Sequence, residues 1–92
     1  MQVKYFAVMR EISGKRMETI EIKGSIRLVD LLRLLAARYG REMDSYVFDQ
    51  CTGALRPILQ YMVDGESHTA SEAYTTMVKD ESVVSIMPTQ GG

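Results

Sequence analysis

The sequence predicts an α+β domain, a mixed β-sheet with one main helix packed across it. Segments with the two-residue period of strands lie on both sides of a single long segment with the period of an amphipathic helix. The order strand, strand, helix and then further strands makes that helix a crossover between a hairpin and the later strands. With 92 residues, 46% of them hydrophobic, the chain is long enough for one domain with a modest core.

A β-hairpin is predicted at the start of the chain. Residues 3–9 (VKYFAVM) are apolar on both alternating faces apart from one lysine, as expected for a strand inside a sheet. Residues 17–23 (METIEIK) alternate, with two isoleucines on one face and polar side chains on the other. The Ser13-Gly14 pair between them is a turn signal, so we expect a short connecting loop.

The helix is predicted over residues 25–39, where apolar side chains form one stripe and the charged ones lie off it. Ser25 is a suitable N-cap, and Gly40 stands where a C-terminal cap belongs. The stripe consists of Leu28, Leu31, Leu32, Leu35, Ala36 and Tyr39.

The stretch after the helix lacks a clean period. For residues 41–56 we expect a loop that can include a short helix, with the Tyr-Val-Phe run at 46–48 turned inward. Residues 58–63 predict a third strand, closed by Asp64-Gly65, a tight-turn dipeptide.

The last part of the chain predicts the strand that completes the sheet. Residues 66–78 are polar and compatible with a short strand and a helical turn, and residues 81–88 form a strand that Pro88 ends. If the first strand is central, the last can pair beside it in parallel, which is a β-grasp arrangement. We therefore expect a domain over residues 1–88 and a flexible tail over residues 89–92.

Composition excludes several classes of function. The formal net charge is −1, the pI is about 5.8 and basic residues form no run, which argues against nucleic acid as the partner. Cys51 is the single cysteine, so neither an internal disulfide nor a cysteine zinc site can form. No apolar run approaches the roughly 20 residues of a membrane span and no signal peptide is evident, so we expect a soluble, cytoplasmic protein.

No catalytic constellation is evident. The lone histidine, His68, has no second histidine or cysteine beside it, and we interpret it as a surface residue. Glu11, Glu18 and Glu21 are interpreted as solvated side chains, not as an acid and base in an apolar pocket. The chain is therefore not expected to act as an enzyme alone, and no metal site is expected.

The glycine pair Gly91-Gly92 has two interpretations. It can be a frayed terminus or a remnant of recombinant expression. Alternatively, the carboxylate of Gly92 is a reactive group that an activating enzyme converts to an acyl-adenylate or thioester. Two residues without Cβ would keep the approach to that carbon open in a narrow passage.

Four segments appear with the order and spacing of a known family. They are VKYFAVMREISG, SIRLVDLLRLLAARYG, ILQYMVDGE and KDESVVSIMPTQGG. Together they resemble the small subunit of molybdopterin synthase (the MoaD type), within the ubiquitin-like sulfur carriers. The resemblance implies a ubiquitin-like β-grasp fold over most of the chain.

The resemblance also implies a reaction at the tail. Gly92 would be adenylated by a ubiquitin-activating-like adenylyltransferase that uses ATP and magnesium, and sulfur would displace AMP to leave a thiocarboxylate. The tail would then enter the large subunit of molybdopterin synthase, in an expected heterotetramer, and donate its sulfur to precursor Z. The carrier itself would bind no cofactor stably.

A docking surface follows from the same resemblance. Phe6 and Ile86 match apolar positions that face the partners, and Arg10 matches a basic one. Pro88, Thr89 and Gln90 would contact the partners ahead of Gly91. Phe6 and Ile86 can equally be core residues, because both lie on predicted strands, and Arg10 can be a plain surface charge.

Two departures and two alternatives accompany this hypothesis. Residues 66–78 are longer and more polar than the family's usual segment, and a second proline common before the tail is missing. One alternative is a ubiquitin-like modifier joined through Gly92 to lysines, as some archaeal relatives are. The other is a sulfur carrier for thiamine synthesis or tRNA thiolation.

Overall fold

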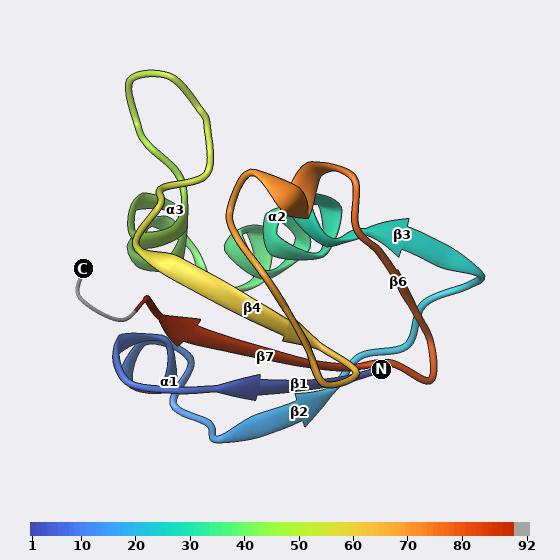
Figure 1. Cartoon of the computed structure of the whole chain (residues 1–92). Helices are drawn as coiled ribbons and strands as arrows, with labels where there is room; N and C mark the ends of the chain where they lie inside the picture. The colour runs from blue at the N-terminus through green and yellow to red at the C-terminus, as the bar shows by residue number, and fades with distance from the viewer. Residues whose placement is uncertain (90–92) are drawn as a thin grey trace.

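A five-stranded mixed sheet forms the centre of the computed structural model, which describes residues 1–89 (Figure 1). The strand order is β2-β1-β7-β4-β5, with β1 parallel to β7 and the other neighbours antiparallel. The predicted parallel pairing of the first and last strands is therefore confirmed. The strands are β1 (Gln2–Tyr5), β2 (Met17–Thr19), β4 (Leu59–Val63), β5 (Glu66–His68) and β7 (Val83–Pro88).

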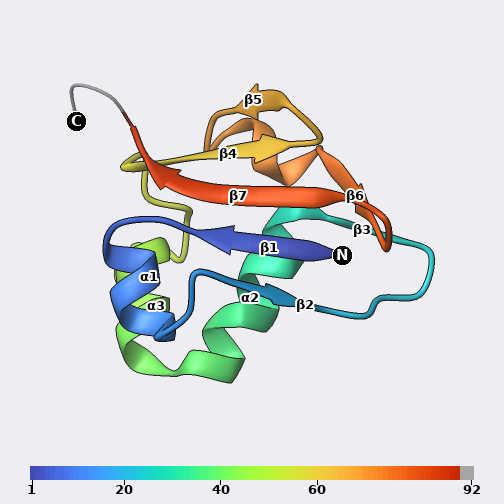
Figure 2. The ribbon, with the colours of Figure 1, turned by 90° about the horizontal axis from the view of Figure 1, so that it is seen from below.

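Helix α2 (Leu28–Tyr39) covers one face of this sheet. Its predicted stripe faces the core, because the first five members are buried and Tyr39 is half-buried. Helices α1 (Val8–Ser13) and α3 (Arg41–Val47) lie at the end of the sheet where β7 finishes, as both views show (Figures 1 and 2). This end is where the predicted tail begins.

The first predicted strand is too long, since β1 ends at Tyr5 and α1 begins at Val8. Between them the N–H of Met9 donates to the carbonyl of Phe6 at 3.2 Å, which closes a turn. Ala7 stands in that turn with φ 54° and ψ −126°, angles that favour glycine. The sequence assigns Met9 to a strand. In the structure Met9 belongs to α1, and its apolar side chain is fully buried.

The helix was predicted three residues too early. Ser25–Arg27 is a strand, β3, which pairs antiparallel with β6 (Met77–Lys79) in a second, two-stranded sheet. The N–H of Leu28 donates to the carbonyl of Thr76 at 2.7 Å. This long-range bond satisfies a free donor at the start of α2, so Ser25 does not serve as a cap.

The remaining elements follow the predictions more closely. The loop expected after α2 contains α3, with Val47 and Phe48 buried and Tyr46 half-buried. Asp64 and Gly65 both have positive φ, 50° and 89°, as in the tight turn predicted. The polar segment after them holds β5, the 3₁₀ helix η1 (Glu72–Tyr74) and β6.

Candidate functional site

The candidate site is the end of β7 and the surface next to it. Three of the predicted site residues, Gln90, Gly91 and Gly92, lie outside the described residues, so their role stays a prediction. The residues that lead to them are described, and they show how the sheet holds the chain just before the glycine pair.

Thr89 remains attached to the sheet after Pro88. Its N–H donates to the carbonyl of Ile58 at 3.0 Å, and its Oγ1 donates to the same oxygen at 3.4 Å. Pro88 is opposite Leu59 in the register of β7 and β4. The pairing therefore continues one residue beyond Pro88, although the predicted tail includes Thr89.

Phe6 and Arg10 lie together beside β7. The N–H of Phe6 donates to the carbonyl of Ile86 at 3.2 Å, and the Phe6 side chain is half-buried. The guanidinium carbon of Arg10 is 5.7 Å from the centre of the Phe6 ring, within the range of a cation–π contact. Arg10 also donates from Nε to the carbonyl of Tyr5 at 3.4 Å. The structure thus groups two of the predicted docking residues, and their contact with a partner stays a prediction.

The side chain of Ile86 does not join this surface. It is fully buried in the core, as is that of Val84, whereas Val83, Ser85 and Met87 are half-buried on the other face of β7. Side chains alternate along a strand, so Met87 points away from the core where Ile86 points into it. The alternation with Val84 was the sequence signal that could have identified this.

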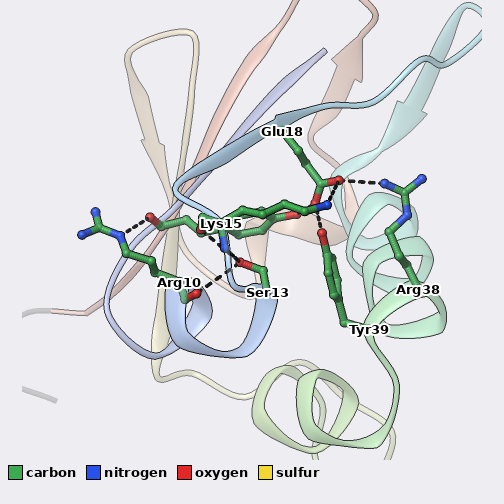
Figure 3. A network of polar contacts seen from close by, with 7 residues as sticks. Arg10, Ser13, Lys15, Glu18, Arg38 and Tyr39 are labelled. Atoms are coloured by element: carbon green, nitrogen blue, oxygen red, sulfur yellow. Dashed lines mark hydrogen bonds and ion pairs between the residues drawn. The ribbon is translucent and has the colours of Figure 1, made fainter.

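A buried carboxylate that the sequence analysis assigned to solvent joins β2 to the end of α2 (Figure 3). The side chain of Glu18 is 8% exposed and accepts hydrogen bonds from the hydroxyls of Tyr5 and Tyr39. Arg38 donates to its Oε1 at 2.7 Å, and the Lys15 ammonium lies 3.5 Å from the same oxygen. The interpretation of Glu18 as a solvated side chain is therefore wrong.

The surroundings of Glu18 shift two pKa values. Burial alone would raise the pKa of Glu18, but the hydrogen bonds from Tyr39 and Tyr5 and the nearby cations outweigh it and hold that pKa below its ordinary value. Burial and the neighbouring carboxylate raise the pKa of Tyr5 strongly. Charged Glu18 and neutral Tyr5 are thus the stable forms. The contacts of this network join β2, the start of the chain and the end of α2.

Among residues 1–89, no three His, Cys, Asp or Glu side chains are arranged to hold a metal ion. Cys51 is exposed in a loop. His68 is mostly covered, with its Nδ1 3.5 Å from the hydroxyl of Thr76. The arrangement can present a surface and a chain end to another protein.

Comparison with protein families identifies the group to which the chain is related. The model of the ThiS family matches residues 3–92, which is nearly the whole chain. The chain belongs to the ThiS family. ThiS proteins are ubiquitin-like sulfur carriers, so the resemblance is confirmed at the level of the family and the molybdopterin branch is not distinguished from the others.

Solved structures share the ThiS fold with this chain. SAMP1 from Haloferax volcanii has a TM-score of 0.80 at 23% identity, covering 100% of this chain and 97% of that one. A putative molybdopterin converting factor subunit 1 from Pyrococcus furiosus has a TM-score of 0.71 at 26% identity, covering 95% and 93%. The thiamine biosynthesis protein ThiS from Geobacter metallireducens has a TM-score of 0.52 at 20% identity, covering 100% and 99%. These likenesses confirm the ubiquitin-like β-grasp fold.

Two further findings concern curated relatives and membrane-spanning helices. A comparison with curated protein sequences finds no match. In the part of the chain that the structure describes, none of the helices has the length and apolar character needed to cross a bilayer.

Proposed function

We propose that this member of the ThiS family is a sulfur carrier for molybdenum-cofactor synthesis. The observation that carries the proposal is the family match, which extends through Gly91 and Gly92. The likeness to the Pyrococcus furiosus protein, a putative molybdopterin converting factor subunit at 26% identity, favours the molybdopterin branch. The four sequence segments that resemble the small subunit of molybdopterin synthase agree with this choice.

The proposed chemistry takes place at Gly92. A carboxylate is a poor electrophile, so an oxygen of the Gly92 carboxylate first attacks the α-phosphorus of ATP, and pyrophosphate leaves. A sulfide donor then adds to the acyl carbon, and AMP leaves with the electron pair of the broken carbon–oxygen bond. The product is a thiocarboxylate in which one oxygen has been exchanged for sulfur.

The catalytic groups are assigned to the partners. An activating enzyme of the ubiquitin-activating type would bind ATP and magnesium, and the large subunit of molybdopterin synthase would hold precursor Z while the sulfur is transferred. This division is supported by the two glycines, which have no Cβ to block a narrow passage.

The decisive experiment is an intact-mass measurement. The full chain is incubated with the activating enzyme of its host, ATP, magnesium and a sulfide donor, and its mass is expected to rise by the difference between one sulfur and one oxygen atom. Omission of ATP and a variant lacking Gly92 are the controls. No mass change with an activating enzyme that modifies its known carrier would contradict the proposal. Release of sulfur to precursor Z by added large subunit would then separate the molybdopterin branch from the thiamine branch.

The same chain allows a test of the protein-modifier alternative. Lys79 is the last basic residue, so trypsin would leave residues 80–92 attached to any lysine that had been joined to Gly92. Peptides from host extract that carry this remnant would indicate a protein modifier. Their absence, together with the mass increase, would support the carrier alone.

A further inference from the structure

A groove between α1 and α3 is an unassigned surface of this molecule. Its volume is about 340 Å³. Helix α1 and helix α3 supply its two walls, and the chain just before β4 supplies one residue at its base. The lining residues are Val8, Glu11, Ile12, Glu42, Ser45, Tyr46 and Arg56.

Apolar and acidic side chains both line the groove. Val8 is 38% exposed, and Ile12 and Tyr46 are half-buried against the core. Glu11 on α1 and Glu42 on α3 are exposed. This combination is suited to a segment with both apolar and positively charged side chains.

Among the described residues that line the groove, Arg56 is the one cation, and it is already bonded within the fold. Arg56 donates from Nη1 to the carbonyls of Ser45 at 3.2 Å and Tyr46 at 3.4 Å. Its N–H also donates to the carbonyl of Val47 at 2.9 Å. Arg56 therefore holds the last turn of α3 and forms no ion pair with either glutamate in the structure.

One wall of the groove and the residue at its base are linked to the end of β7. Arg56 is two residues before Ile58, whose carbonyl accepts the N–H of Thr89. Val8 is two residues after Phe6, whose N–H donates to Ile86. An enzyme that reaches the residues beyond Thr89 must approach this end of the molecule, next to α1 and α3 (Figures 1 and 2).

We propose that the groove between α1 and α3 docks the activating enzyme, through a segment in which a lysine or arginine lies between apolar side chains. This inference rests on the proposed function. The apolar side chains would cover Val8, Ile12 and Tyr46, and the cation would reach Glu11 and Glu42. Buried apolar contacts at the centre supply most of the affinity, whereas exposed charges at the rim mainly change the association rate and its dependence on salt.

The test measures the steady-state rate of thiocarboxylation against the concentration of carrier. The double variant Glu11→Lys and Glu42→Lys is expected to raise KM about tenfold at low salt with kcat unchanged, and the difference is expected to shrink at high salt. The matched control is Glu66→Lys with Glu81→Lys. It makes the same change in charge on exposed residues at the opposite end of β7, and KM should stay close to wild type.

A second variant tests the apolar side chains of the groove. Val8→Asp is expected to raise KM about tenfold or more, with little effect of salt, because a carboxylate would have to be desolvated within the contact. The thermal unfolding midpoint of each variant is measured first, and an unchanged midpoint shows that it folds. A wild-type KM for both the Glu11/Glu42 variant and Val8→Asp would overturn the inference while the proposed function stands. If the wild-type chain is not modified at all, the proposed function fails and the inference fails with it.

Discussion

The environment of Glu18 in the structure differs clearly from the solvated surroundings that the sequence predicts. This residue stands on the edge strand β2, yet four side chains from three other parts of the chain surround its carboxylate. A buried carboxylate contributes to stability only while it is charged and its donors are in place. Glu18 therefore links the stability of the fold to pH.

The change Glu18→Gln is expected to lower the free energy of unfolding by about 2 kcal/mol at neutral pH, because hydrogen bonds to a charged group are lost. The half-exposed cations add little. The pKa of Glu18 is lowered in the folded state from an ordinary value of 4.5, so its contribution is present above that pH and lost as pH falls through the folded value. Urea unfolding from pH 7 to pH 3 should show the difference from wild type shrinking below about pH 4.5. A difference that is constant with pH would contradict this role.

Ala7 has a backbone conformation that glycine adopts more easily. Its φ of 54° with ψ of −126° costs on the order of 1 kcal/mol for a residue with a Cβ. Ala7→Gly is therefore expected to raise the free energy of unfolding by up to about 1 kcal/mol, less the entropy that glycine gains in the unfolded chain. Chemical denaturation measures the change. The matched variant Ala54→Gly, at an exposed loop residue with no positive φ, should destabilise slightly, and a similar loss at Ala7 would contradict the argument.

Tyr61 carries a buried polar atom without a partner. Its side chain is fully buried, and within residues 1–89 its hydroxyl has no hydrogen-bond partner. Tyr61→Phe removes that hydroxyl and keeps the ring, so it is expected to be neutral or to stabilise by about 1 kcal/mol. A loss above 1 kcal/mol in thermal or chemical unfolding would show that the hydroxyl is satisfied. Burial also raises the pKa of Tyr61, so the variant should also reduce the loss of stability above about pH 10.

At the scale of elements, the described end of β7 shows how far along the chain the sheet pairing extends. The backbone of Thr89 continues the pairing with the segment before β4, although Pro88 has no N–H to contribute. The chain is therefore held up to three residues before Gly92. If Gly92 is the reacting residue, an activating enzyme would have to approach the sheet to within three residues of Thr89.

Hydrogen exchange measures this attachment directly. The amide of Thr89 is expected to exchange at least about tenfold more slowly than in an unstructured peptide, because its N–H is bonded to Ile58. Thr89→Val keeps that N–H and removes only the longer side-chain contact, so protection at residue 89 should persist. Exchange at the unprotected rate in the wild type would place the release point at Pro88, where the sequence analysis placed it.

At the scale of the whole molecule, the core of the described residues extends along β7 as far as Ile86. Ile86 is the last fully buried side chain of β7. Deletion of Gly91 and Gly92 is therefore expected to change the thermal midpoint by less than about 2 °C and to abolish the thiocarboxylate mass increase. A clear loss of stability would contradict a division between a folded domain and a functional chain end.

Much of this fold is predictable because its signals are local. The period of α2, the Asp64-Gly65 turn and the alternation in β4 each lie within a few consecutive residues. The strand and helix limits around Ala7 and Ser25 were not predictable in the same way. Each depends on a partner elsewhere, such as the carbonyl of Thr76 that accepts the N–H of Leu28.

The sequence by itself determined the fold class, the family and the glycine pair on which the proposed chemistry depends. These follow from the periods of apolar residues, from the order of the elements and from residue identity, none of which needs a three-dimensional neighbour. Only the tertiary structure decided which face of β7 the side chain of Ile86 occupies. It also decided that the side chain of Glu18 is buried and that Thr89 is hydrogen-bonded to the segment before β4. Each of these is set by contacts between distant parts of the chain, as with Tyr5 and Tyr39, which lie 13 and 21 residues from Glu18.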